Sequence, residues 1–180
     1  IRVDKHQRTS QPHIWALGDV SSDRLLKHVA NAEARTVAAN LLIDGGELAA
    51  TDHRYIPHAV FTEPQIAAVG ATEEQLQGWG TPYVEFKQRY ADVAFGWALE
   101  DEGHFVKLLA DPRTWHLLGA HIIGPQAATL IQPMIQAMSF GQTVQELARG
   151  QYWIHPALTE VLENALLGLL KAPRPKELDA

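Results

Sequence analysis

The sequence predicts a mixed fold in which helices and β-strands share one chain. The runs 103–110 and 115–123 are apolar and are joined by Asp111-Pro112-Arg113-Thr114, a hairpin turn signal. Apolar residues recur at three- and four-residue steps over 158–169, which is the period of a helix. A chain of 180 residues with 46% hydrophobic residues is also long and apolar enough to bury a sizeable core.

The first part of the chain is expected to hold two strands and a helix. Alternation over 1–4 predicts a short strand, and the apolar run 13–20 predicts a buried strand ending at Gly18-Asp19. Residues 25–43 have a helical pattern, and Gly45-Gly46 is expected to end that helix. Its apolar positions are Val29, Ala30, Ala34, Val37, Ala38, Leu41 and Leu42. The polar stretch 47–55 predicts a connection that contains a domain boundary.

Beyond that boundary the pattern predicts strands interleaved with short helices. The strands are expected in two extended pieces of 59–70 around Pro64 and at 83–90, 103–110 and 115–123. The helices are expected at 72–80, 127–140, 144–148 and 158–169. Pro133 is expected to kink the helix 127–140, and Pro156 is expected to be the first residue of the last helix.

His155 and Glu160 form the candidate catalytic pair. An imidazole titrates near neutral pH, and a carboxylate bonded to one ring nitrogen raises the basicity of the other. Because Pro156 disfavours the α conformation before it, His155 is expected to lie outside the helix and to fold back toward Glu160. Spacing alone favours a second interpretation. His155 would then cap a turn and Glu160 would be a solvated helix charge, since neighbours on a helix face are three or four residues apart.

The segment His155-Pro156-Ala157-Leu158-Thr159-Glu160 resembles the C-terminal His-Pro-x-x-x-Glu signature of the flavin-dependent pyridine nucleotide–disulfide oxidoreductases. This family includes glutathione reductase, lipoamide dehydrogenase and mycothione reductase. The flanks 150–153 and 163–169 are most similar to mycothione reductase, and Trp153 stands where lipoamide dehydrogenases usually carry a second histidine. The resemblance implies that His155 is the acid/base of thiol–disulfide exchange and that Glu160 orients it.

A second stretch, 9–19, resembles the second flavin-binding motif of the same family. The resemblance implies that Asp19 binds the ribityl chain of FAD. It also implies that the helix start at Lys27 and His28 directs N–H groups at the flavin, where they would stabilise developing negative charge. Many relatives have Thr-Pro at these two positions, so a surface role for the Lys27 and His28 side chains is an open alternative.

The resemblance also implies the architecture. Residues 1–50 would be the C-terminal remnant of an FAD-binding domain, residues 51–172 the dimerisation domain and residues 173–180 a flexible tail. The dimerisation domain would be of the α+β class, with an antiparallel sheet flanked by helices. The chain is expected to form a homodimer through large apolar faces. These faces are expected around Ile122, Leu130, Ile135 and Leu166.

The sequence has no cysteine and no Gly-x-Gly-x-x-Gly loop, although the family needs two redox cysteines and a first nucleotide-binding motif. The chain is therefore expected to be the C-terminal third of a longer disulfide reductase that uses FAD and NADPH. By itself it is expected to be inactive and to retain no cofactor. The alternatives are a stand-alone dimerisation module without catalysis and a parent of the lipoamide dehydrogenase type.

Charge and composition limit the classes of molecule that the chain is expected to bind. A net charge of −6 argues against nucleic acid and anionic membranes as partners. No apolar run approaches the roughly 20 residues needed to span a bilayer, and no secretory signal is visible, which predicts a cytoplasmic protein. The histidine pairs His53/His58 and His116/His121 have poor spacing for metal ligands on a helix, so no metal is expected. The expected partner is a small-molecule disulfide.

Overall fold

The computed structural model describes residues 1–174 and divides the chain into two compact units, Ile1–Ile56 and the unit that begins at Pro57. The expected flexible tail 173–180 falls almost entirely outside the described residues. No helix in the described part of the chain is long and apolar enough to cross a membrane.

The first unit is built around one helix, α1 (Lys27–Leu42), preceded by the short 3-10 helix η1 (Gly18–Val20). The strands predicted at 1–4 and 13–20 do not form, so both predictions are wrong. The pairing of Arg8 with Trp15 is an isolated bridge outside the named strands. A strand needs a neighbour to satisfy its backbone groups. Residues 1–56 supply no ladder for the run 13–20, and Ile14 within it is exposed.

Helix α1 buries a face that is largely polar, which the apolar pattern did not predict. Its buried residues are Val29, Glu33, Thr36, Val37 and Asn40, whereas Leu41 and Leu42 are exposed. The polar side chains hold the loops that surround the helix. The Asn40 Oδ1 accepts the Ala49 N–H at 2.7 Å, and the Thr36 hydroxyl accepts from that of Thr51 at 2.9 Å. The helix ends at Leu42 with Ile43 extended, before the two glycines expected to end it.

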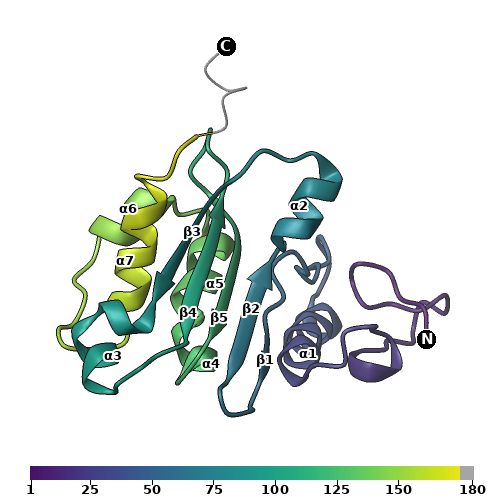
Figure 1. Ribbon diagram of the computed structural model, residues 1–180. Helices are drawn as coiled ribbons and strands as arrows, with labels where there is room; N and C mark the ends of the chain where they lie inside the picture. The colour runs from purple at the N-terminus through teal and green to yellow at the C-terminus, as the bar shows by residue number, and fades with distance from the viewer. Residues whose placement is uncertain (175–180) are drawn as a thin grey trace. The chain divides into compact units, whose positions relative to one another are not determined.

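The second unit contains a five-stranded antiparallel sheet, as predicted (Figure 1). Its strands are β1 (His58–Val60), β2 (Ile66–Gly70), β3 (Val84–Arg89), β4 (Phe105–Ala110) and β5 (Leu117–Ile123). Their order in the sheet is β1-β2-β5-β4-β3. The hairpin between β4 and β5 confirms the turn predicted at 111–114.

Helices accompany this sheet along the chain. They are α2 (Glu73–Trp79), α3 (Ala94–Ala98), α4 (Ala127–Leu130), α5 (Gln132–Phe140), α6 (Val144–Arg149) and α7 (Glu160–Leu169), and a 3-10 turn, η2 (Tyr90–Asp92), follows β3. Helix α7 packs on β3 and β4, and α5 packs on β5. Alternate residues of the sheet, such as Val106, Leu108 and Ile122, are consequently buried. Burying this apolar surface is the main stabilising contribution to the unit.

Two helix boundaries follow the predicted capping and proline rules. Thr72 and Gln75 form the capping box that opens α2, and Gly80 closes it in the left-handed conformation at φ 66°. The single helix predicted over 127–140 is wrong, because α4 and α5 are separate. Pro133 lies in the first turn of α5, where its missing N–H breaks no hydrogen bond.

Helix α7 begins later than predicted. It starts at Glu160 and not at Pro156, and the His155-Pro156 peptide bond is cis. Residues 157–159 form tight turns in which the Glu160 N–H donates to the Ala157 carbonyl at 3.2 Å. The predicted apolar face of α7 is confirmed by the burial of Leu158, Val161, Leu162, Ala165, Leu166 and Leu169.

The contact between α7 and β3 is close at one position. A Cβ placed on Gly168 would lie 2.2 Å from a ring carbon of Phe86. Only hydrogen fits there as the sequence stands, because real Cβ atoms do not approach other carbons so closely. The ring of Phe86 therefore occupies the space that a side chain at position 168 would need.

Candidate active site

His155 and Glu160 lie in direct contact at the start of α7. The His155 Nδ1 donates to the Glu160 Oε1 at 2.8 Å, and the Ala157 N–H donates to the Glu160 Oε2 at 3.2 Å. Both carboxylate oxygens are therefore engaged. The His155 hydrogen bond holds the pKa of the Glu160 carboxyl below its ordinary value, with support from Ala157 and against partial desolvation. Glu160 is thus ionised at neutral pH.

The exposure of the two side chains differs. The imidazole of His155 is 66% exposed, whereas the carboxylate of Glu160 is 18% exposed. The His155 Nε2 makes no hydrogen bond to any described residue, so it is open to a ligand. The arrangement is an accessible imidazole whose other nitrogen is fixed by an ionised carboxylate, and it can give or take a proton at Nε2.

Neighbouring residues hold this pair in place. The buried apolar face of α7 anchors Glu160, because the helix cannot rotate without exposing that face. On the other side of His155, the Trp153 indole N–H donates to the Ala148 carbonyl at 3.1 Å. That bond ties the approach to His155 onto the end of α6. Tyr152 and Ile154, which come just before His155 in the chain, are strongly exposed apolar side chains.

Three of the four residues around which the dimer interface was expected are buried within the chain. Ile122, Leu130 and Leu166 belong to its own core, so their assignment to an exposed interface was wrong, whereas Ile135 is half-buried. A helical period identifies an apolar face but does not say what covers it. The exposed large apolar residues of the second unit include Phe140, Tyr152 and Ile154.

In the first unit, Asp19 is exposed in η1, directly after Gly18, and its carboxylate makes no hydrogen bond to a described residue. Gly18 has φ 70°, and a Cβ there would lie 3.4 Å from the Ala30 Cβ, so the turn lies close against α1. No side chain caps the start of α1 at Leu26. A free carboxylate beside an uncapped helix start fits a ligand with hydroxyl groups and a ring that takes up negative charge, as FAD does on reduction.

The side chains of Lys27 and His28 are exposed at that helix start. The Lys27 Nζ donates to the Asn31 Oδ1 at 2.8 Å. The Lys27 ammonium group therefore lies along the surface of the helix. His28 also has an interaction within the chain. Among the described residues, no group of three or more His, Asp or Glu side chains could hold a metal ion.

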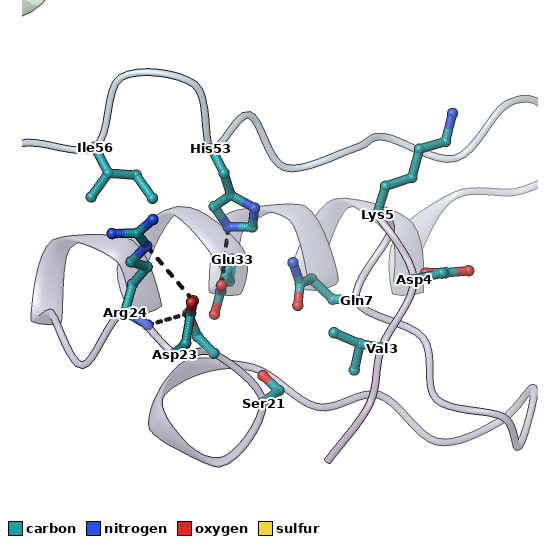
Figure 2. A pocket seen from close by; sticks show the side chains of 11 residues that line it. Val3, Asp4, Lys5, Gln7, Ser21, Asp23, Arg24, Glu33, His53 and Ile56 are labelled. Carbon is teal, nitrogen blue, oxygen red and sulfur yellow. Dashed lines mark hydrogen bonds and ion pairs between the residues drawn. The ribbon is translucent and has the colours of Figure 1, made fainter. Parts of the chain in front are cut away.

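The sequence pattern missed Glu33. Its carboxylate is 2% exposed and accepts the Gly18 N–H at 2.6 Å through Oε2 and contacts the His53 Nε2 at 3.1 Å through Oε1. This pair borders a hollow of about 550 Å³, which Gln7, Asp23 and other residues also line. Figure 2 shows the side chains around it. A single acid between Ala32 and Ala34 in an otherwise non-acidic helix was the available signal.

Comparison with known proteins gives a consistent result. The family model described as "Pyridine nucleotide-disulphide oxidoreductase, dimerisation domain" matches residues 56–166. A mycothione reductase from Mycobacterium tuberculosis is 61% identical over 172 residues, covering 94% of this chain and 38% of that protein. A dihydrolipoyl dehydrogenase from Mycobacterium bovis is 36% identical over 170 residues, covering 94% of this chain and 36% of that protein. The chain therefore spans less than two fifths of the length of these curated relatives.

Solved structures agree with the sequence relatives. LpdA from Mycobacterium tuberculosis superposes with a TM-score of 0.85 at 27% identity, covering 93% of this chain and 36% of that one. The flavoprotein disulfide reductase RclA from Escherichia coli superposes with a TM-score of 0.83 at 27% identity, covering 92% of this chain and 38% of that one.

Proposed function

Because the chain belongs to the pyridine nucleotide-disulphide oxidoreductase family, we propose that it is the C-terminal part of an FAD-dependent NAD(P)H disulfide reductase of the mycothione or glutathione reductase type. In this proposal it supplies the dimer interface and the His155–Glu160 acid/base pair. The 61% identity to mycothione reductase supports that enzyme type over others.

His155 acts in the step that cleaves the substrate. A thiolate of the parent's cysteine pair attacks one sulfur of a small-molecule disulfide, the S–S bond breaks, and the second sulfur leaves as a thiolate. That thiolate takes the proton from the His155 Nε2. Glu160 remains ionised and stabilises the imidazolium that exists before the transfer. FAD, when bound, would carry electrons from NADPH to the cysteine pair.

One observation carries this assignment: the 2.8 Å hydrogen bond from the His155 Nδ1 to the Glu160 Oε1, which leaves Nε2 open. The alternative, a turn-capping histidine beside a solvated glutamate, is less well supported. A solvated Glu160 would not have both oxygens engaged and a side chain only 18% exposed.

The domain assignment is part of the proposal. Residues 1–50 are the remnant of an FAD-binding domain and contribute Asp19, with Lys27 and His28 at the helix start, to the flavin site. Residues 51–172 are the dimerisation domain, which forms a homodimer in the parent. Residues 173–180 are the tail, and a cytoplasmic location remains a prediction of the sequence. The exposed, unpartnered Asp19 carboxylate and the uncapped start of α1 support the flavin assignment.

A parent of the lipoamide dehydrogenase type is the second candidate, because dihydrolipoyl dehydrogenases match over nearly the same span at 36% identity. Turnover of the full-length parent with NADPH and mycothione, compared with NADH and lipoamide, separates the two. A stand-alone dimerisation module without catalysis predicts no turnover in either assay.

The isolated chain gives a further test. We expect the purified 180-residue protein to oxidise no NADPH with a disulfide and added FAD, because it has no cysteine. It should also carry no flavin after purification, since Asp19 and the start of α1 are only part of an FAD site. NADPH oxidation, or a stoichiometric flavin absorption band, would contradict the proposal.

A further inference from the structure

We infer that Glu33 is a positioning residue for the flavin site, because it fixes the turn that presents Asp19 and is itself held by His53. The inference rests on the proposed function, since it concerns the same FAD. It begins with the buried hydrogen bond from the Gly18 N–H to the Glu33 Oε2, which is 2.6 Å long. A buried bond to a charged acceptor is among the stronger ones in proteins.

The Gly18 carbonyl accepts hydrogen bonds from residues of the same turn, whereas the Gly18 N–H donates to a residue outside the turn. The carbonyl accepts the N–H groups of Ser21 and Ser22, each at 2.9 Å, and the Ser21 hydroxyl at 3.2 Å. These bonds shape η1 but do not attach it to α1. Glu33 makes that attachment, because its carboxylate accepts the Gly18 N–H one residue before Asp19.

The same helix carries the second element of the proposed flavin site. Lys27 and His28 open α1, and Glu33 lies six residues after Lys27. Six residues of α-helix span about 9 Å, so one rigid segment connects the helix start to the turn. Glu33 therefore sets the position of Asp19 relative to the helix start, and both must be correctly placed for one ligand to contact them.

His53 completes the support. Its Nε2 lies 3.1 Å from the Glu33 Oε1, and its ring is 42% exposed at the edge of the hollow in Figure 2. A buried carboxylate is costly unless both oxygens are paired. His53 thus holds the carboxylate in the orientation that receives Gly18, although it lies 20 residues further along the chain.

The test is FAD affinity in the full-length parent. Glu33→Leu keeps the bulk of the side chain but removes the acceptor, so it should weaken FAD binding about tenfold or more, the effect of a 1.4 kcal/mol loss. Glu33→Gln keeps an oxygen for the Gly18 N–H and should bind FAD more tightly than Glu33→Leu. Arg35→Leu places a leucine at an exposed position of the same helix and is the matched control.

Flavin titration of the apoprotein gives the dissociation constant, visible circular dichroism reports the flavin environment, and thermal unfolding of each apoprotein reports folding. A folded Glu33→Leu protein that binds FAD as tightly as the control overturns the inference. If Glu33→Leu does not fold, His53→Phe replaces it. That variant should also weaken FAD binding, and unchanged affinity would overturn the inference.

A second measurement separates this inference from the proposed function. In the 180-residue chain, the Gly18 amide should exchange slowly with solvent, and Glu33→Gln should retain part of that protection. Rapid exchange of the wild-type Gly18 amide overturns the role of Glu33 whether or not the parent binds flavin. If the wild-type parent binds no FAD, the proposed function fails, and the inferred role for Glu33 fails with it even where Gly18 is protected.

Discussion

The Nδ1 of His155 lies 2.8 Å from the Oε1 of Glu160, although the two residues are five positions apart. Neighbours on a helix face are three or four residues apart, so a continuous helix would not bring them together. The contact exists because α7 begins only at Glu160 and the chain turns between the two residues.

His155→Ala in the full-length parent should slow disulfide reduction about a hundredfold or more, the usual effect of losing a general acid. Reduction of the flavin by NADPH should change little, because that half-reaction needs no proton at the substrate. Stopped-flow measurement of each half-reaction tests this. Equal slowing of both halves would indicate misfolding or lost dimerisation, and normal turnover would favour a capping histidine.

Glu160→Gln should slow the same half-reaction by less than His155→Ala. The amide keeps the shape and can still accept from the His155 Nδ1, but it lacks the charge that stabilises the imidazolium. Glu163→Gln, one turn further along α7, is the matched control, because Glu163 has no hydrogen bond to His155. Equal rates for the two variants would contradict the assigned role of Glu160.

The 180-residue chain should self-associate at micromolar concentration through its second unit. Phe140, Tyr152 and Ile154 are strongly exposed there, and soluble monomers rarely leave large apolar patches uncovered. Sedimentation velocity measures the association. The double variant Tyr152→Ser with Ile154→Ser should weaken it, whereas Phe61→Ser, at an exposed residue after β1, serves as the control. A strict monomer for the unaltered chain would refute this prediction.

Amide hydrogen exchange should be faster over residues 1–45 than over 158–169. The first unit has no sheet, and several of its apolar side chains, including Leu41 and Leu42, face solvent. The residues of α7 lie over the sheet with their apolar face fully buried. Local opening should therefore need less free energy in the first unit. Mass-spectrometric exchange that is slower over 1–45 would contradict this expectation.

Local patterns were enough to predict much of the second unit. Leu158, Val161 and Leu162 follow a helical period and are buried in α7, and the turn at 111–114 joins two paired strands. These elements find their partners inside the chain, so the local pattern and the tertiary packing agree. The core of the dimerisation domain is therefore readable from the sequence.

The errors concern features that depend on distant partners. The run 13–20 is apolar enough for a buried strand, but residues 1–56 offer no neighbouring strand. The polar buried face of α1 exists because Asn40 binds Ala49 and Glu33 binds Gly18. The helical period of the sequence does not predict such contacts. The late start of α7 is set by turns between Ala157 and Glu160, which the proline rule alone does not predict.

The contact of Gly168 with Phe86 has a consequence for the evolution of this family. A Cβ at position 168 would lie 2.2 Å from the Phe86 ring, so the two positions share one volume. Substitution at either position is then constrained by the residue at the other. Among homologues, alanine or serine at position 168 should co-vary with a smaller residue at position 86. In an evolutionary change from glycine at 168 with phenylalanine at 86 to a larger residue at 168 with a smaller one at 86, position 86 should change first. A cavity is tolerated better than a steric overlap.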